Sequence, residues 1–402
     1  MSTERVVITG VGAVTPVGRD VHHTWRSVVD GVSGITPITR FDATGFPVTF
    51  AAEIDSVRGE DEASIREELI DLALAEALEM SGDLPYSPDR IGVCLGAEAA
   101  RPALDLLARE YRSNSSGEVS EFVRNAADAP ARSVARRIGS EGPCTTVSTA
   151  CTSSSQAVGE GLLRMRRGEV DAMVVGGVDA LVGPLMVTGF SLLGALSTRN
   201  NEPSKASRPF DVDRDGFVLG EGAGFLVLER ESAALARGAE ILAELSGFGC
   251  SCNAWRITDS PPDGRGAAQA IKAALEDAGL EPSDIGYINA HGTSTPMNDP
   301  SESRAINRVF GEHRPYVSST KSSMGHLVAA CGAVEAVICV QVVRHGVLPP
   351  TINLDNIDPD CDLNHVQNIS KSFACEHALT NAFGFGGSNG SLIISRWNSR
   401  VG

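Results

Sequence analysis

Residues 146–155 of the chain read TVSTACTSSS, a stretch that joins a strand-like segment to a predicted helix. Its β-branched residues favour a strand, and the small residues that follow favour a tight turn into the helix. The turn places the thiol of Cys151 in the first turn of that helix. Unpaired backbone N–H groups and the helix dipole favour an anion there, so we expect the thiol pKa to fall below its usual value of about 8.5. A cysteine among small residues is also often an unreactive buried side chain, and this stretch alone leaves both interpretations open.

Strand-like and helix-like stretches alternate along the whole chain, which predicts an α/β fold of layered sheets and helices. Helix candidates with apolar residues at helical spacing cover residues 65–80, 267–278 and 326–344. The last of these is apolar nearly all round, which indicates a buried central helix. The strand candidates cover residues 6–9, 172–175, 225–228, 285–288 and 392–395.

The composition is that of a compact globular enzyme with one large core or two core-forming units: 402 residues, 42% hydrophobic and 21% charged. Nine cysteines without regular spacing indicate a reducing compartment, so we expect a cytoplasmic protein. The longest apolar stretch, residues 327–343, is interrupted by Glu335 and Gln341 and falls short of the ~20 residues of a membrane span. The first residues do not resemble a secretion signal. A net charge of −17 argues against nucleic-acid binding, which requires a basic surface.

Two strings imitate ligand-binding motifs and are discounted. GVGAVT at residues 10–15 follows a strand but lacks the third glycine and the later acidic residue of a dinucleotide-binding loop. DVDRDG at residues 211–216 imitates the start of a calcium loop, but Gly222 stands where that loop needs a glutamate. We expect a turn at residues 211–216, and we expect neither a bound cofactor nor a metal.

Three further segments change the interpretation of Cys151. NAHGTSTP at residues 289–296 ends a predicted strand with a histidine and continues as a loop rich in hydroxyl groups. STKSSMGH at residues 319–326 has a lysine and then a histidine at the start of the buried helix. NAFGFGGSNG at residues 381–390 is a glycine-dense loop before the last predicted strand. Each is weak when taken singly, because such histidines and glycines more often serve structure.

Together, and in this order, these segments closely resemble the elongating β-ketoacyl synthases, the Cys-His-His condensing enzymes of the thiolase superfamily. The resemblance covers essentially the whole chain. It implies a thiolase-like fold in which two pseudo-repeated halves form a five-layered α-β-α-β-α sandwich. Residues 1–240 are then the half with the nucleophilic cysteine, and residues 241–402 the half with the catalytic histidines. Other matching motifs are ALSTRN (195–200), SRPFD (207–211), RDGFVLGEGAG (214–224) and PPTINLD (349–355).

The resemblance also assigns roles to residues of this sequence. It implies that Cys151 accepts the acyl chain, that His291 and His326 are the two catalytic histidines, and that Lys321 and Glu335 are the lysine and buried glutamate beside them. It implies that Phe385 gates the site, with its backbone N–H joining that of Cys151 in an oxyanion hole. Thr293 and Thr295 match residues that hold the phosphopantetheine arm.

The chemistry of carbon–carbon bond formation explains these residue types. By this resemblance, the Cys151 thiolate would take the growing chain from an acyl carrier protein as a covalent thioester. Malonyl carrier protein would then lose CO2, and two neutral histidines would donate N–H bonds to the enolate oxygen that forms. The buried Lys321–Glu335 pair sets local electrostatics and geometry or serves structure alone, and the sequence leaves both roles open. The resemblance implies that the substrates are carried on the phosphopantetheine of the carrier protein, and we expect this chain to bind no cofactor itself.

Two branches of the family share features with this sequence. TACTS, HGTST and GFGGSN resemble the fatty acid elongation enzymes, whereas residues 252–258 and 297–299 are similar to actinobacterial type II polyketide ketosynthase subunits. We prefer a reduced or polyene polyketide chain as substrate, with fatty acid elongation as the alternative. A non-catalytic chain-length-factor subunit, or a cysteine hydrolase with one histidine, is disfavoured by Cys151 together with both histidines.

The expected partners are an acyl carrier protein and a second subunit, in a homodimer or a heterodimer with a chain-length factor. The carrier protein is itself acidic, so the net charge of −17 should oppose their encounter unless basic clusters compensate. Ordinary solvated helix faces explain the candidate clusters equally well. These candidates are Arg132, Arg136 and Arg137 on one stretch, and Arg164, Arg166 and Arg167 on another.

Overall fold

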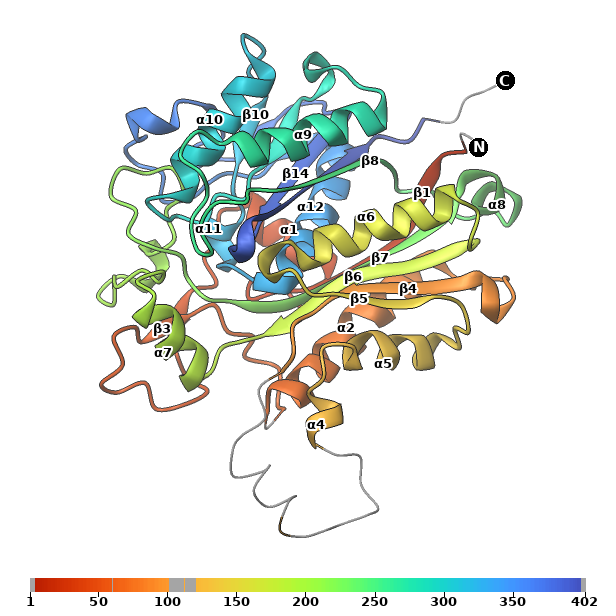
Figure 1. Ribbon diagram of the computed structural model, residues 1–402, viewed down its shortest axis with the longest axis horizontal. Helices are drawn as coiled ribbons and strands as arrows, with labels where there is room; N and C mark the ends of the chain where they lie inside the picture. Colours follow the sequence, from red (N-terminus) through yellow and green to blue (C-terminus); the bar gives the residue numbers. More distant parts are fainter. Residues whose placement is uncertain (1–3, 60, 101–111, 113–120, 399–402) are drawn as a thin grey trace.

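A computed structural model describes residues 4–59, 61–100, 112 and 121–398, and its main sheet has 11 strands (Figure 1). Along the sheet the order is β12-β10-β9-β14-β15-β8-β1-β7-β6-β4-β5. The strands are β1 (Val6–Val14), β4 (Ile91–Gly96), β5 (Cys144–Val147), β6 (Ala172–Ala180), β7 (Glu221–Arg230), β8 (Ala243–Cys252), β9 (Tyr287–Asn289), β10 (Tyr316–Ser318), β12 (Asn364–His365), β14 (His377–Phe383) and β15 (Ser388–Ser395). Two small ribbons pair β2 (Thr36–Pro37) with β3 (Phe50–Ala51), and β11 (Val347–Leu348) with β13 (Lys371–Ser372).

The sheet consists of two halves with the same topology. If the strands of each half are numbered 1 to 5 along the chain, their order from the outer edge inward is 3-2-4-5-1 in the half made of β1, β4, β5, β6 and β7. The same order recurs in the half made of β8, β9, β10, β14 and β15. The halves meet where β1 pairs with β8 at two register positions, Val7 with Glu244 and Ile8 with Ala243. The predicted pseudo-repeated halves are therefore confirmed as the architecture. The division of the chain at residues 240 and 241 into separate domains stays a prediction.

Helices complete five layers around these halves. In Figure 1, α9 and α10 cover one half of the sheet, α6 and α12 lie between the halves, and α2 and α5 cover the other half. The α-helices are α1 (Val21–Val29), α2 (Glu62–Ser81), α4 (Glu121–Arg124), α5 (Ala129–Ile138), α6 (Ser153–Arg166), α7 (Pro184–Leu192), α8 (Glu231–Ala236), α9 (Arg265–Ala278), α10 (Asn298–Phe310), α11 (Lys321–Met324) and α12 (Cys331–His345). Short 3₁₀ helices that matter below are η2 (Ala150–Thr152), η5 (Val328–Ala330) and η7 (Phe385–Gly387).

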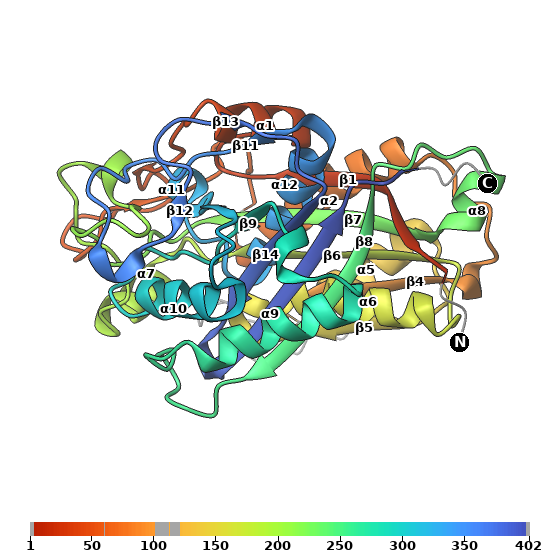
Figure 2. The same ribbon diagram turned by 90° about the horizontal axis from the view of Figure 1, so that it is seen from above.

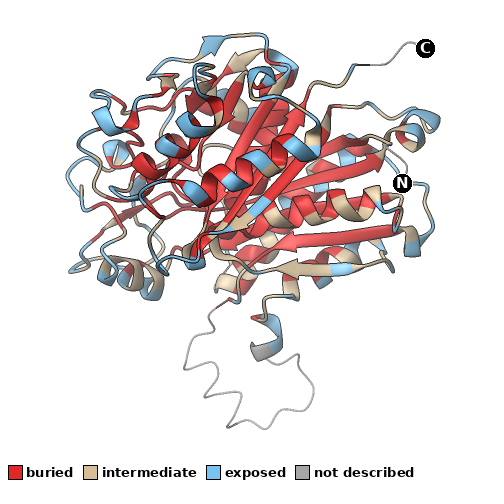
Figure 3. Ribbon diagram, turned by 45° about the horizontal axis from the view of Figure 1, so that its top comes forward, coloured by how far each residue is buried: buried red, intermediate tan, exposed pale blue. Residues whose placement is uncertain are grey.

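Of the two inner helices, α12 is the more buried, as its apolar sequence predicts. Residues 331–343 are all buried, and Figure 3 shows exposed residues mainly on the outer helices and loops. Val328–His345 is long and apolar enough to cross a membrane, but 89% of it is buried inside the fold. Burial between the sheet halves, rather than length, identifies it as a core helix.

One helix boundary differs from its prediction and matters for the site. The α-helix expected from residue 326 begins only at Cys331, and His326 itself is extended. The N–H of His326 donates to the carbonyl of Val218 at 2.7 Å, so a neighbouring loop fixes the residue in a bridge instead of a helical turn. Figure 2, seen from above, shows α12 at the centre of the molecule.

Candidate active site

Cys151 and His326 occupy equivalent places in the two halves. Each follows the third strand of its half, β5 or β10, and each precedes one of the two central helices, α6 or α12. The topology thereby directs both side chains to the same point between the sheet halves. The Cys151 sulfur and Nε2 of His326 lie 3.0 Å apart, and their side chains are buried.

His291 follows β9 and completes a group of three. Its ring meets that of His326 edge-on, with centroids 5.4 Å apart and planes at 85°. A carboxylate that the motifs did not reveal fixes this loop: Glu302 of α10 accepts from the N–H groups of His291 and Gly292, each at 2.8 Å. Asn381 also donates to Glu302, at 3.1 Å. The polar spacing of α10 gave no signal for this role, because it depends on packing between distant elements.

Burial and charge keep both histidines neutral. Burial lowers the pKa of His291 well below 6.5, and the charge of Lys321 lowers it further. The pKa of His326 is lowered well below 6.5 by the same two causes. Neutral imidazoles can accept a proton at one nitrogen or donate an N–H to a developing anion, as the sequence analysis expects.

Phe385 lies in η7 and directs its backbone N–H to the Cys151 sulfur, beside the N–H of Cys151 itself. Two backbone donors therefore converge where an oxyanion would form on an acyl group at this sulfur. The Phe385 ring stands 6.4 Å from Phe190 of α7, whose ring lies 5.3 Å from Phe217. Gly386, at φ 84°, gives the loop a left-handed turn that other residues rarely adopt.

The expected lowering of the Cys151 pKa is wrong. Burial raises the pKa of this thiol to about 12, although the charge of Lys321 and the backbone N–H groups lower it. The helix start thus favours an anion, but loss of water around the sulfur disfavours it more strongly. His326, in contact with the sulfur and neutral, is the base within reach of its proton.

The rate of Cys151 alkylation should consequently depend steeply on pH. Only the thiolate reacts, so the rate with iodoacetamide should rise about tenfold per pH unit between about pH 7 and about pH 10. Peptide mass mapping separates Cys151 from the exposed Cys144, Cys250 and Cys252. A rate that levels off near about pH 8 would mean that the helix start dominates after all.

Lys321 and Glu335 form a buried ion pair behind the histidines. Burial lowers the pKa of Lys321, but Glu335 outweighs it, so the pKa is raised and the ammonium group stays charged. Burial raises the pKa of Glu335 to about 7 against the opposing charge of Lys321. Neither residue lines the cavity around Cys151. The positive charge of Lys321 nevertheless helps to keep both histidines neutral.

A cavity of about 350 Å³ joins the side chains of Cys151, His291 and His326 to the surface. One wall is apolar and comes mainly from α7 and its flanks, where Met186 and Phe190 lie. Hydroxyl groups also line the cavity, among them those of Thr293 and Thr295, whose oxygens are 2.9 Å apart. The cavity is lined by Glu98, Ala150, Cys151, Leu181, Met186, Phe190, Leu193, Gly194, Ala195, Phe217, Thr258, Asp259, Ser260, His291, Thr293, Thr295, Pro296, Met297, Asn298, His326, Val328, Phe383, Gly384 and Phe385.

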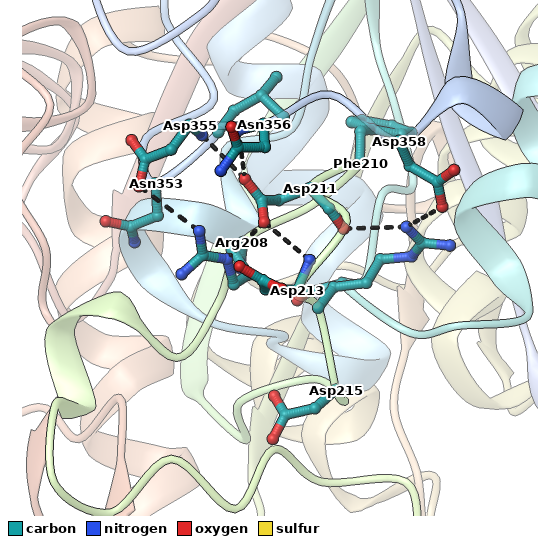
Figure 4. A network of polar contacts seen from close by, with 12 residues as sticks. Arg208, Phe210, Asp211, Asp213, Asp215, Asn353, Asp355, Asn356 and Asp358 are labelled. Carbon is teal, nitrogen blue, oxygen red and sulfur yellow. Dashed lines mark hydrogen bonds and ion pairs between the residues drawn. The ribbon is translucent and has the colours of Figure 1, made fainter.

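A polar network centred on Asp211, shown in Figure 4, adjoins the loop of Thr293 and Thr295. The Asp211 carboxylate accepts from the Arg208 side chain and from the backbone N–H groups of residues 213, 355 and 356. Arg214 donates to the Thr295 carbonyl at 3.1 Å. Asp215 points away to Ser197, so the acidic side chains of residues 211–216 do not converge. The turn predicted there is confirmed, and the described residues hold no cluster of metal ligands.

The six arginines proposed for carrier-protein docking are mostly engaged locally. Among the described residues, all but Arg136 have an ion-pair partner, and none of the six lines the cavity. Arg166, for example, lies 2.8 Å from Asp277. Such paired arginines attract an acidic partner weakly, which favours their interpretation as ordinary helix faces.

The chain matches two family models, the N-terminal domain of beta-ketoacyl synthase over residues 3–234 and its C-terminal domain over residues 242–355. It is 40% identical over 414 residues to 3-oxoacyl-[acyl-carrier-protein] synthase 2 of Synechocystis sp., covering 99% of each chain. It is 41% identical over 412 residues to the protein of the same name in Coxiella burnetii, covering 98% and 99%.

Solved structures agree in fold. A type II polyketide synthase carrier protein in complex with its ketosynthase, AntDE:AntF, superposes with a TM-score of 0.89 at 32% identity, over 99% of this chain and 100% of that one. A beta-ketoacyl synthase of Burkholderia phymatum gives 0.87 at 35%, over 98% and 100%. The ishigamide ketosynthase/chain length factor gives 0.86 at 34%, over 99% and 100%.

Proposed function

We propose a reaction, a pathway and a partner from the premise that this chain belongs to the β-ketoacyl synthase family. Membership makes the protein an acyltransferase of the 3-oxoacyl synthase type. The proposed reaction joins malonyl carrier protein, with loss of CO2, to an acyl chain held on Cys151. One observation carries this proposal: the Cys151 sulfur touches neutral His326 in a cavity that also contains His291 and two converging backbone donors.

The first half-reaction loads the acyl chain. As the Cys151 sulfur attacks the thioester carbonyl, Nε2 of His326 takes the thiol proton and passes it to the departing pantetheine sulfur. A carbon–sulfur bond to the protein forms and the bond to the carrier breaks. The carbonyl oxygen becomes negative during the attack, and the N–H groups of Cys151 and Phe385 stabilise it.

The second half-reaction makes the carbon–carbon bond. Malonyl carrier protein loses CO2, and its electron pair moves into an enolate whose oxygen accepts N–H bonds from His291 and from His326, which for this step carries its proton on Nε2 instead of Nδ1. The enolate carbon attacks the acyl carbonyl, and the Cys151 sulfur leaves as a thiolate that takes a proton from water. The hydroxyl groups of Thr293 and Thr295 lie in the same cavity, where they can hold the pantetheine arm.

For the pathway, we favour fatty acid elongation over the polyketide substrate that the sequence analysis preferred. The curated relatives with about two fifths of positions identical are named 3-oxoacyl-[acyl-carrier-protein] synthase 2. The polyketide ketosynthases among the solved structures are less similar in sequence. A polyketide role remains the second candidate, since those ketosynthases share the fold with TM-scores of 0.86 to 0.89.

We propose a second subunit because the surface exposes the edge of a sheet and a group of apolar side chains. Strand β5 lies at the edge of the main sheet, and no strand among the described residues pairs with its outer side. On and beside α7, Leu185, Leu192 and Leu193 are 66%, 84% and 58% exposed. A homologous chain, either identical or a chain-length factor, would cover such surfaces. All nine cysteines are unpaired, which supports a reducing, cytoplasmic location.

Reconstitution separates the two pathways. We expect the protein purified alone to convert saturated acyl carrier protein and malonyl carrier protein into a 3-oxoacyl product, detected by mass on the carrier. An active homodimer that elongates saturated chains supports fatty acid elongation. Activity only after co-expression with a homologous subunit, and on unsaturated or polyketone chains, contradicts that pathway and supports the second candidate. The Cys151→Ala variant is the background control in both assays.

A further inference from the structure

The contact between Cys151 and His326 depends on two loops with unusual backbone angles. Ala150, directly before the cysteine, has φ 54°, and Val328, shortly after the histidine, has φ 46°. Residues other than glycine seldom adopt positive φ, and such angles persist only where surrounding contacts determine them. The loops therefore need support from outside the motifs that carry the reacting groups.

An acidic side chain provides that support on each side. The carboxylate of Glu98 accepts from the N–H of Ala150 at 2.9 Å, on the cysteine side. The carboxylate of Asp179, at the end of β6, accepts from the N–H of Ala329 at 3.1 Å, on the histidine side. Asp179 is fully buried, so its charge requires a close cationic partner.

Arg66 of α2 connects the two supports. Its Nη1 donates to the backbone carbonyl of Glu98 at 2.6 Å, and its Nη2 donates to Asp179 at 2.9 Å. A third bond from Nη2 reaches Glu62, one turn earlier on α2, at 2.9 Å. The Arg66 side chain is only 3% exposed and does not line the cavity, so it acts on neither substrate directly.

We propose that Arg66 is a positioning residue of the condensing reaction, which holds the Cys151 thiol and the His326 imidazole at contact distance through Glu98 and Asp179. This inference rests on the proposed role of Cys151 as the acyl acceptor. A guanidinium group suits the position because its planar fork carries five donors and reaches a carbonyl and two carboxylates together. The ammonium group of a lysine is a point charge and cannot span the same set.

Arg66 also balances charge near the thiol. The charged groups that act on Cys151 are Lys321, which favours the thiolate, and Asp179, which opposes it. Both neighbouring histidines are neutral. Removal of Arg66 takes one positive charge away from the Asp179 carboxylate, so less thiolate should form at a given pH. Loss of the contact between Cys151 and His326 and loss of the Arg66 charge should both lower the reactivity of Cys151.

The test measures alkylation of Cys151 by iodoacetamide in the full-length protein, followed by peptide mass mapping. We expect Arg66→Met to lower the rate constant by roughly 10- to 100-fold at about pH 8, and Arg66→Lys to lower it less. The matched control is Arg237→Met. Arg237 donates to Glu229 and to the carbonyl of Ser81 at the other end of α2, away from the cavity. The Arg237→Met variant also removes an arginine from a fully buried carboxylate, and it should leave the alkylation rate unchanged.

If Arg66 only stabilises the fold, its replacement should affect the alkylation rate of Cys151 no more than Arg237→Met does. The proposal is overturned if both Arg66 variants alkylate at the wild-type rate, or if Arg237→Met loses as much reactivity. Where Arg66→Met does not fold, by circular dichroism, Arg66→Lys decides. Iodoacetamide needs no carrier protein, so failure of the proposed function appears separately, as wild-type protein that alkylates normally but is never acylated.

Discussion

Replacement of Cys151 by alanine is expected to abolish acyl loading and condensation. No other thiol occupies the point where His326 and the two backbone donors converge. After incubation with acyl carrier protein, the intact protein should therefore show no added acyl mass. Slow decarboxylation of malonyl carrier protein should persist in this variant, because the histidine pair that stabilises the enolate is unchanged.

Cys331 offers the matched control for that experiment. Its thiol is also buried, and it donates to the backbone carbonyl of Cys151 at 3.2 Å without lining the cavity. Cys331→Ala should keep the acyl adduct. If Cys151→Ala still becomes acylated and still condenses, the nucleophile has been assigned to the wrong residue.

Replacement of His291 and replacement of His326 by alanine should impair different steps of the reaction. His326 touches the Cys151 sulfur, whereas His291 meets only the His326 ring among these groups. His291→Ala should thus lower condensation by about 10²- to 10³-fold, because one donor to the enolate is lost, while acyl loading continues. His326→Ala should lower both loading and condensation, because the base for the thiol is lost as well.

Loading is read from the mass of the intact protein, and condensation from the 3-oxoacyl product on the carrier. His345→Ala serves as control, since His345 lies at the far end of α12 and stacks on Trp25 at 5.9 Å, outside the cavity. Equal loss of loading in His291→Ala and His326→Ala would show that the division of labour between the histidines is wrong.

Sequence patterns predicted helices correctly where contacts between residues close in the chain determine the structure. Apolar spacing predicted a helix over residues 65–80, and α2 spans Glu62–Ser81, its start fixed by a capping box between Asp61 and Ser64. The pattern failed at residues 326–330, because a hydrogen bond to Val218, distant in the chain, holds His326 extended. Helical periodicity contains no information about such a partner.

No motif pointed to the residues that support the site, because their roles also depend on contacts with distant parts of the chain. Glu302 holds the His291 loop, and Arg66 connects Glu98 with Asp179, yet each comes from an element without a recognisable sequence signature. An acidic or basic residue on a helix usually faces solvent, and only packing reveals that these are buried and bonded. The thiol pKa is a parallel case: the helix start is local, but the burial that raises the pKa to about 12 is not.

The sequence by itself determined the family, the α/β architecture and the candidates for the reacting groups, because these depend on residue types in a fixed order along the chain. Only the tertiary structure decided how those groups meet. Cys151 and His326 are separated by 175 positions, and their 3.0 Å contact follows from two topologically equivalent halves packed face to face. Their protonation states were decided there too, since exclusion of water and the nearby charge of Lys321 arise only when the halves close around the site.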